Sequence, residues 1–517
     1  MVRRQGRQPD RCCRTQARTR FRWSLNFVKS LTSFGVSSTS GKARLARRLL
    51  GPIRRDLAGL AAAAGASLPL RPGLYIYRLE PAGGTRRIHL RVAADRSALL
   101  LVDVTDAIHL NPTAALLAKA ALDGRSLSRA IGLVKNRFRG ADAQRIESDA
   151  RRIFSAIEHL ATTTEPCPTC GLGPVDRLPP FAAPVSAPYK ADLALGYGCN
   201  NACRHCYNEP QRIDMRPLST GDWRRVLKKL ATIGIPHVIF TGGEPTLVDS
   251  LDELVRAAER LGLVSGLNTN GRRLADAALP RSLAAAGLSH VQVTLQSPRA
   301  DVHNAMAGAD AFDQTVRGVR NALEAGLHTI TNTTLTRQNI DQPERLVEFL
   351  HALGLKTFAA NGMIHSGSGR DSAEAIAEED LGPVLIRLRD RAAELGMRML
   401  WYTPTAYCRL SPVELELGPR RCNAAEYSIC IEPNGDVLPC QSYYEPAGNI
   451  LTDRWETIWN GRLFQRFRCR IADPRGGGLD EQCWACPDLS LCGGGCPLQR
   501  NNLANEPGVK NGDWLRA

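Results

Sequence analysis

The sequence predicts an α/β protein with a mainly parallel sheet, preceded by a small α+β module and followed by a cysteine-rich domain. Three observations predict this architecture. Strand and helix patterns alternate six times between residues 191 and 361, as in a parallel sheet with covering helices. Residues 73–162 instead show strands followed by helices. The last 115 residues have few periodic segments but contain nine of the sixteen cysteines.

Composition agrees with a multidomain globular chain. At about 150 residues per domain, 517 residues predict three or four domains. The cysteines make up about 3% of the chain, well below the ~8–10% of secreted disulfide frameworks. They are clustered, which predicts metal sites in a reducing compartment and therefore a cytoplasmic protein. The longest apolar run, residues 57–70, is too short to span a bilayer, so no membrane partner is expected.

The net charge of +16 comes almost entirely from the N-terminus. Residues 1–55 contain 15 Lys or Arg and one acid, Asp10. The rest of the chain therefore lacks the distributed basic surface that phosphate binding needs, and nucleic acid is an unlikely partner. We expect residues 1–68 to be a basic, disordered tail; an organelle transit peptide is the alternative.

Residues 69–165 predict a winged-helix-like α+β module of three strands and then three helices. Alternating apolar residues in 74–76 and 88–92, and the apolar run 99–102, predict the strands. Asn111 followed by Pro112 predicts the N-cap and first turn of the first helix, and apolar stripes in 127–138 and 146–157 predict the others. A generic winged helix that acts as a spacer between domains is the alternative.

Residues 166–188 form a proline-rich linker that contains Cys167 and Cys170 in the sequence CPTC. Two ligands cannot complete a tetrahedral metal site. This knuckle is therefore either half of a zinc or cluster site or an unpaired turn.

The six strands of the central sheet are expected at 193–197, 237–241, 264–269, 290–296, 329–335 and 356–361. Helices fill the intervals, as at 219–230, where Ser219 and Asp222 have capping-box spacing. Trp223 opens the buried stripe of that helix. Six units are too few for a complete eight-stranded barrel, so the sheet is an incomplete barrel or an open, doubly wound sheet.

The first strand leads into GCNNACRHC, which places Cys199, Cys203 and Cys206 in a C-x3-C-x2-C loop. Three thiolates on a short loop suit three corners of a cubane iron–sulfur cluster and leave one iron open for another ligand. A structural zinc knuckle is the alternative, but zinc would need a fourth protein ligand.

This loop, together with GGEP after the second strand, resembles the motifs of radical S-adenosylmethionine (SAM) enzymes. The resemblance implies a partial (β/α)6 TIM-type barrel over residues 189–400, with Cys199, Cys203 and Cys206 as the catalytic ligands of a SAM-binding [4Fe-4S] cluster. In that family an external reductant of the flavodoxin or ferredoxin type supplies one electron, and SAM is cleaved to a 5′-deoxyadenosyl radical. The implied cofactor-binding residues are Gly242, Gly243, Glu244, Pro245, Asn268, Asn270, Thr294, Gln296 and Gly362.

One position departs from the family pattern. Met306 stands where many relatives carry an arginine near the cofactor, and Arg299 or Arg337 could substitute for it. Four ring side chains near the motifs are expected to pack around the site rather than act as catalytic bases: His205, Tyr207, His303 and His365.

The C-terminal cysteines resemble six of the seven signature cysteines of the SPASM auxiliary-cluster domain, here residues 401–517. The resemblance implies one or two auxiliary [4Fe-4S] clusters. The inner one would use Cys422, Cys440 and Cys496, with Cys408 as the expected fourth ligand. The outer one would use Cys483, Cys486 and Cys492. No cysteine follows Cys496, so the fourth outer ligand stays open among Asp488, Asp513, Cys430 and Cys469; zinc ligation by these pairs is the alternative.

The segment LLLVDVTDAIHLNPTAALLAKAALDGRSLSRAI resembles the PqqD-like peptide-recognition domain, which implies that a leader peptide adds to the edge of its sheet. The three resemblances together imply a radical SAM maturase that modifies a ribosomally synthesised, leader-guided precursor peptide. One alternative is a radical SAM enzyme acting on a small-molecule cofactor precursor of the tetrapyrrole or quinone type. The other is a non-catalytic iron–sulfur electron carrier.

Overall fold

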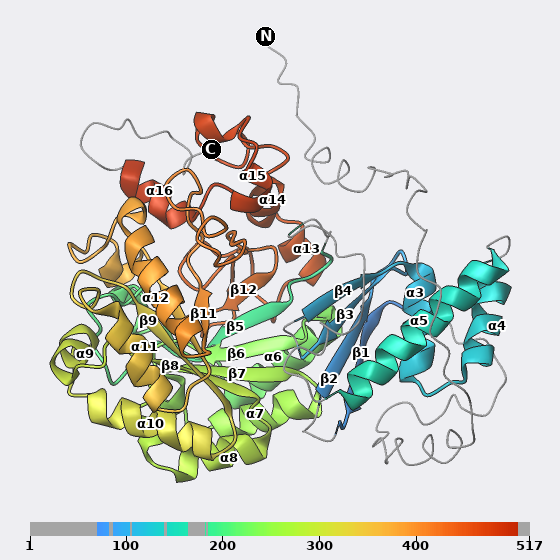
Figure 1. Ribbon diagram of the computed structural model, residues 1–517, viewed down its shortest axis with the longest axis horizontal. Helices are drawn as coiled ribbons and strands as arrows, with labels where there is room; N and C mark the ends of the chain where they lie inside the picture. The colour runs from blue at the N-terminus through green and yellow to red at the C-terminus, as the bar shows by residue number, and fades with distance from the viewer. Residues whose placement is uncertain are drawn as a thin grey trace. The chain divides into compact units, whose positions relative to one another are not determined.

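The computed structural model describes residues 70–81, 86–103, 106–138, 142–163, 181 and 185–504 (Figure 1). The contacts divide the chain into two compact units, Met1–Arg177 and Leu178–Ala517. The expected tail at 1–68, Cys167, Cys170 and Asp513 lie outside the described residues. No helix among the described residues has the length and apolar character needed to cross a membrane.

The first unit contains a four-stranded antiparallel sheet and three helices. The strands are β1 (Gly73–Leu79), β2 (Arg86–Val92), β3 (Ala98–Val102) and β4 (Asp106–Leu110), paired in that order. The helices are α3 (Pro112–Leu122), α4 (Leu127–Arg137) and α5 (Ala143–Thr162). The prediction of three strands was wrong by one, because β4 has only five residues and begins four positions after the last residue of β3. The predicted N-cap is confirmed, since Asn111 Oδ1 accepts a hydrogen bond from Ala114 N at 2.8 Å.

The core of this unit lies between one face of the sheet and the helices. Ile88 and Leu90 of β2 and Leu100 of β3 are buried there against Leu117 of α3 and Leu160 of α5. Alternate residues of the strands supply the sheet side, as the period of two predicted.

The second unit is an α/β body around a nine-stranded sheet of order β11-β10-β9-β8-β7-β6-β5-β12-β13. Its strands are β5 (Lys190–Ala194), β6 (His237–Thr241), β7 (Val264–Thr269), β8 (His290–Thr294), β9 (His328–Thr334), β10 (Thr357–Asn361), β11 (Arg398–Trp401), β12 (Ser428–Ile431) and β13 (Val437–Leu438). All pairs are parallel except the β12–β13 hairpin. The predicted α/β class is confirmed, and the sheet is an incomplete barrel.

The sequence missed three strands of this sheet. A seventh parallel strand, β11, extends one edge, and β12 of the C-terminal segment pairs with β5 at the other, Ser428 opposite Lys190. The strands β11 and β12 have only four residues each. Such short segments do not show a recognisable alternation of apolar and polar residues in the sequence.

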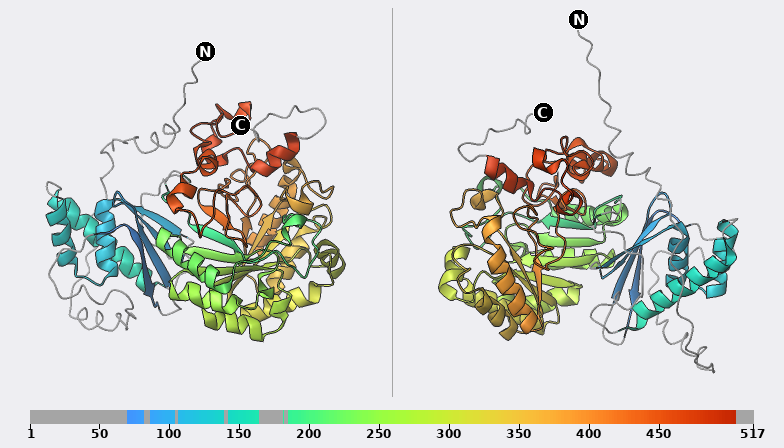
Figure 2. Two further views of the ribbon diagram at one scale, coloured as in Figure 1. Left: turned by 180° about the vertical axis from the view of Figure 1, so that it is seen from behind. Right: turned by 45° about the horizontal axis from the view of Figure 1, so that its top comes forward.

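The helices that follow the strands are α6 (Thr220–Ile233), α7 (Leu251–Arg260), α8 (Ala278–Ala286), α9 (Ala300–Ala307), α10 (Phe312–Glu324), α11 (Pro343–Ala352) and α12 (Gly382–Glu394). The capping box of α6 is confirmed: Ser219 Oγ accepts from Asp222 N at 3.1 Å, and Trp223 is buried. The C-terminal segment adds α13 (Trp455–Trp459), α14 (Arg462–Cys469), α15 (Leu489–Cys492) and α16 (Pro497–Ala504). Figure 2 shows α6–α12 along the outer side of the sheet and the C-terminal segment gathered next to β5 and β12.

The two faces of the sheet differ in chemistry. Leu267 and Val291 are fully buried with the outer helices. On the other face, Asn268 of β7 lies opposite Gln292 of β8, and Thr294 lies opposite Asn332 of β9. The inner, concave face therefore presents amide and hydroxyl groups toward the space that the barrel encloses.

Candidate active site

The cysteine loop lies at the carboxyl end of β5, and its backbone is fastened to the end of α9. Ala202 N donates to Ala307 O at 3.0 Å, and Arg204 N donates to Met306 O at 3.1 Å. Gly308 has φ +61°, and a Cβ there would overlap Ala202 O. The loop that carries Cys199, Cys203 and Cys206 is thus positioned by backbone hydrogen bonds to the last residues of α9.

The glycines of GGEP also help to position the cysteine loop. Gly243 N donates to Gly196 O at 2.8 Å, and Glu244 N donates to Gly198 O at 2.9 Å. A Cβ on Gly242 would overlap Gly196 O, and one on Gly243 would overlap the Tyr197 and Gly198 carbonyl oxygens. These two loops can approach so closely only because no side chain separates them.

Glu244 is buried and fastens the end of β6 to the end of β7. Its carboxylate accepts hydrogen bonds from Thr246 N, the Thr269 hydroxyl at 2.7 Å and Asn270 N at 2.8 Å. Burial raises the pKa of Glu244, and these donors oppose that rise. Pro245 follows directly and begins a short 3-10 turn, Pro245–Leu247.

Asn270 and Arg272 hold the cysteine loop from the end of β7. Asn270 Nδ2 donates to Asn200 Oδ1 at 2.7 Å and lies 3.9 Å from Cys199 Sγ. Arg272 Nη1 donates to the Asn200 carbonyl and, at 3.0 Å, to Asn201 Oδ1. The sequence reasoning missed Arg272, because no motif marks an arginine two residues after a strand-end asparagine.

Gln296 supports the loop through His205. Gln296 Nε2 lies 2.8 Å from His205 Nε2, and Gln296 Oε1 accepts from Thr334 N at 2.9 Å. Burial lowers the pKa of His205 to about 4, so the neutral ring nitrogen accepts from the amide. Of the other predicted cofactor residues, Asn268 and Thr294 are half-buried on the concave face.

The glycine-rich segment after β10 packs against the far end of the loop. Ser368 N donates to Cys206 O at 2.8 Å, and Gly367, with φ +56°, has the Cys206 and Asn208 carbonyl oxygens where a Cβ would lie. Gly362, at the start of this segment, donates its N–H to Thr403 Oγ1 at 2.8 Å.

The position that departs from the family pattern is apolar. Met306 is buried, with its sulfur 3.9 Å from Thr336 Oγ1. Both arginines suggested as substitutes are exposed, and Arg299 pairs with Asp301 at 2.5 Å. Arg337 makes a backbone hydrogen bond to Glu374 O at 3.0 Å.

The three thiols share one electrostatic environment. Burial raises the pKa of Cys203 to about 12, and the charges of Cys206 and Cys199 add to the rise. Burial likewise raises the pKa of Cys199 and Cys206. Asn201 N donates to Cys199 Sγ at 3.4 Å, the kind of N–H to sulfur bond that cluster ligands accept. Three thiols that become thiolates together need a strong positive partner, and this donor set fits an iron–sulfur cluster.

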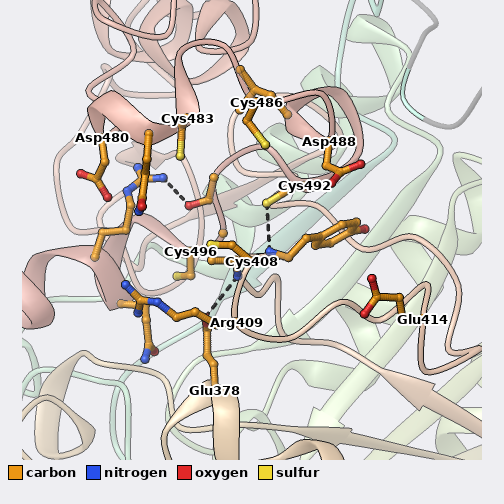
Figure 3. Close-up of a pocket in the computed structure, with 18 residues that line it drawn as sticks. Glu378, Cys408, Arg409, Glu414, Asp480, Cys483, Cys486, Asp488, Cys492 and Cys496 are labelled. Atoms are coloured by element: carbon orange, nitrogen blue, oxygen red, sulfur yellow. Dashed lines mark hydrogen bonds between the residues drawn. The ribbon is translucent and has the colours of Figure 1, made fainter.

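A second group of cysteines surrounds a cavity of about 340 Å³ in the C-terminal segment (Figure 3). In Figure 3, the sulfur atoms of Cys483 and Cys486 point toward the side of the cavity where Cys492, Cys408 and Cys496 lie. Asp488, one of the candidate fourth ligands, also lines this cavity. Cys408, predicted with the inner set, lines the same cavity as the outer set, and so does Cys496.

The inner cysteines lie beside the buried Arg470 and the half-buried Arg500. Arg470 is 2% exposed, donates to Cys422 O through Nη2, and has no partner for Nε and Nη1 among the described residues. Burial and then the charge of Arg470 lower the pKa of Arg500, and the charges of Asp480, Cys496 and Cys422 oppose that decrease. A buried cation without a carboxylate is costly unless an anionic group compensates it, and a thiolate-ligated cluster is anionic. The surroundings of Cys422 and Cys496 fit such a cluster.

The remaining candidate ligands lie apart from the cavity. Cys430 packs with Ala194, Tyr197 and Leu438 against β5, and Cys469 is buried at the end of α14. Within the described ranges, no three His, Cys, Asp or Glu side chains form a site for a single metal ion.

The fold and the site define an iron–sulfur enzyme of the α/β barrel type. The model of the Radical SAM superfamily matches residues 193–350, and that of the SPASM iron–sulfur cluster-binding domain matches residues 422–487. Mycofactocin maturase MftC of Mycobacterium tuberculosis is 30% identical over 336 residues, which cover 62% of this chain and 82% of that protein. PqqA peptide cyclase of Xanthomonas campestris is 30% identical over 345 residues, 62% of this chain and 85% of that protein.

A solved structure shares the fold. The crystal structure of Streptococcus suis SuiB bound to the precursor peptide SuiA has a TM-score of 0.56 at 18% identity, covering 82% of this chain and 96% of that one. From these matches, the chain belongs to the radical SAM superfamily and carries a SPASM domain. It is a radical SAM enzyme that uses SAM, a [4Fe-4S] cluster and auxiliary iron–sulfur clusters.

Proposed function

We propose that this enzyme is a maturase that modifies a ribosomally synthesised, leader-guided precursor peptide. The observation that carries the proposal is the likeness to two enzymes named as a maturase and a peptide cyclase, each matched over more than four-fifths of its length. The presence of an additional α+β unit before the barrel supports it, because a long substrate needs a binding surface outside the catalytic cavity.

In this proposal Cys199, Cys203 and Cys206 hold the catalytic cluster, which when bound supplies one-electron cleavage of SAM to a 5′-deoxyadenosyl radical. The residues around the loop keep that site in place. Gly242, Gly243 and Asn270 fasten the loop to the neighbouring strand ends through the contacts described above.

The remaining predicted cofactor residues form two groups, those buried in hydrogen bonds and those on the concave face of the sheet. Glu244 and Gln296 are buried in hydrogen bonds that hold the loop, so we assign them positioning roles. Asn268 and Thr294 are half-buried on the concave face, so they are free to face bound cofactor or substrate. The amides and hydroxyls of that face suit the polar backbone of a peptide.

We assign leader recognition to the first unit as a PqqD-like domain. Its sheet begins with β1 and ends with β4, so each of these strands has one edge unpaired within the sheet. An extended peptide can add to such an edge through backbone hydrogen bonds, while side-chain pockets select its sequence. We also propose an external one-electron reductant of the flavodoxin or ferredoxin type and a cytoplasmic location, where thiols stay reduced.

The test is anaerobic co-expression with each short open reading frame beside the gene, followed by peptide mass measurement. We expect one peptide to change mass, and the change to vanish with Cys203→Ala. The purified enzyme should then convert the same synthetic peptide with SAM and dithionite. Unchanged peptides together with active SAM cleavage would contradict the peptide substrate but not the radical SAM assignment.

A small-molecule substrate is the second candidate. AdoMet-dependent heme synthase of Oleidesulfovibrio alaskensis is 27% identical over 334 residues, 84% of that protein. If this reading is correct, tetrapyrrole precursors should raise 5′-deoxyadenosine formation in the purified enzyme, and removing residues 1–177 should leave that stimulation intact.

A further inference from the structure

The C-terminal cavity has one cysteine too many for a single cluster. Five cysteines line it: Cys408, Cys483, Cys486, Cys492 and Cys496. A fully ligated cubane takes four thiolates, so one of the five must belong to another site. Which one it is decides how both auxiliary sites are completed.

The chain before Cys408 is hydrogen-bonded to Cys492. Tyr407 N donates to Cys492 Sγ at 3.4 Å, and Cys492 Sγ lies 3.7 Å from Thr405 O. Cys408 is the next residue after this donor. The segment is further held because Gly495 lies against Thr405 and Ala406, where a Cβ would come within 3.0 Å of Ala406 N. The Tyr407 and Thr405 contacts bring Cys408 to Cys492, which lines the same cavity as Cys483 and Cys486.

Cys496 interacts with the inner group instead. Cys496 lies close enough to Cys422 and Cys440 for their charges to interact. By contrast, Cys483 lies within the same range of Cys492 and Cys408.

We propose that Cys408 is the fourth ligand of the outer auxiliary cluster, together with Cys483, Cys486 and Cys492. This replaces the sequence-based assignment of Cys408 to the inner site. It also completes the outer set of three cysteines with a fourth thiolate. Of the earlier candidates, Asp488 shares the cavity wall, whereas Cys430 and Cys469 do not line it.

The inner site then has three thiols among the described residues, Cys422, Cys440 and Cys496, with Arg470 and Arg500 beside them. One corner of the inner cluster is left for a ligand other than these cysteines. The inference rests on the auxiliary clusters alone and does not depend on the proposed peptide substrate.

Differential alkylation tests the assignment without changing Cys408. The reconstituted holoenzyme is compared with an outer-site variant, Cys483→Ala with Cys486→Ala, and an inner-site variant, Cys422→Ala with Cys440→Ala. Each is treated anaerobically with iodoacetamide, and labelling of Cys408 is quantified by peptide mass spectrometry beside Mössbauer measurement of cluster iron. Cys408 is exposed, so it reacts once no iron holds it. We expect labelling in the outer-site variant only.

Labelling of Cys408 in the holoenzyme, or in an inner-site variant that retains its outer iron, would overturn the proposal. So would protection of Cys408 in the outer-site variant. As a second measurement, Cys408→Ser should alter the same Mössbauer component as Cys483→Ser, while Cys469→Ser, at a cysteine that does not line the cavity, leaves it unchanged. If Asp488→Asn alters that component and Cys408→Ser does not, Asp488 is the ligand and the proposal is wrong.

Discussion

Cys199, Cys203 and Cys206 lie on one loop, and the ends of four neighbouring elements, α9, β6, β7 and β10, fasten its backbone. The auxiliary cysteines come instead from four separated stretches of a segment with little regular structure. In the first region, backbone hydrogen bonds and close glycine contacts fix the thiols. In the second, buried arginines lie beside the cysteines and single side-chain contacts join the stretches. The loop is therefore positioned by the fold, whereas the auxiliary sites need their clusters to complete them.

The largest expected difference between the regions is in SAM cleavage. Cys203→Ala should reduce 5′-deoxyadenosine formation to background, because the cleaving cluster loses a ligand. Cys486→Ala should leave part of the cleavage but abolish modified product. High-performance chromatography of reactions with dithionite measures the first, and peptide mass the second. Equal loss of cleavage in both variants would mean that the auxiliary domain only maintains the fold.

The glycine contacts of the loop give the next effect. Gly243→Ala should force the loop away from its position, because the new Cβ would overlap two backbone carbonyl oxygens that cannot rotate away. A displacement of this kind costs on the order of 100-fold in rate. Gly196→Ala is the matched control, since nothing lies within 4 Å of its added Cβ. SAM cleavage per loaded cluster compares the two, and similar rates would show that the glycine contact does not position the loop.

The buried arginines of the auxiliary region should affect redox properties. Removing the charge of Arg470 by Arg470→Met should make the inner cluster harder to reduce, because a nearby cation stabilises the more negative reduced state. Arg454, whose side chain is 84% exposed, provides the control Arg454→Met. Potentiometric titration followed by electron paramagnetic resonance should show a shift to more negative potential in the first variant only. Unchanged potentials in both variants would show that the charge of Arg470 does not affect the reduction of the inner cluster.

The smallest expected effect comes from a buried carboxylate of the auxiliary region, Glu378, which contrasts with Glu244 beside the cysteine loop. Glu244 has several donors, whereas Glu378, in the auxiliary cavity, accepts from Ala406 N at 3.2 Å. Burial raises the pKa of Glu378 to about 6. Its contribution to stability is therefore complete below about pH 4.5 and is lost as the pH rises through about 6, a loss of about 2 kcal/mol.

Glu378→Gln should remove that pH dependence. The thermal unfolding midpoint of the variant should exceed that of the parent above about pH 6 and approach it near about pH 4.5. Parallel profiles across this range would show that Glu378 stays neutral or is compensated by another group.

The sequence was informative where structure is regular. The strands β6 and β7 begin and end where the apolar runs predicted, and the capping box of α6 formed as expected. The cysteine loop was located because three thiols within eight residues leave a signal in the sequence alone. Its hydrogen-bonded supports were found only in part. Gln296 was named as a cofactor residue and not as a support of the loop, and Arg272 was missed, since both act across strand ends that only the folded sheet brings together.

The auxiliary region shows the limit of the same reasoning. Cysteine spacing identified the residues but not their partners, because Cys408 reaches the cavity through a turn whose contacts have no sequence period. The short strands β11 and β12 were missed for the related reason that tertiary pairing, and not local pattern, forms them.

The central claim is that the loop of Cys199, Cys203 and Cys206 leaves one iron open for SAM, whereas four thiolates close the outer auxiliary cluster. Mössbauer spectra of the iron-57 holoenzyme with and without SAM test it most directly. The account predicts that SAM changes the parameters of a single iron site, and that this change disappears when the three loop cysteines are replaced by alanine. A spectrum that SAM leaves unchanged, or a change that persists in that variant, would contradict the account.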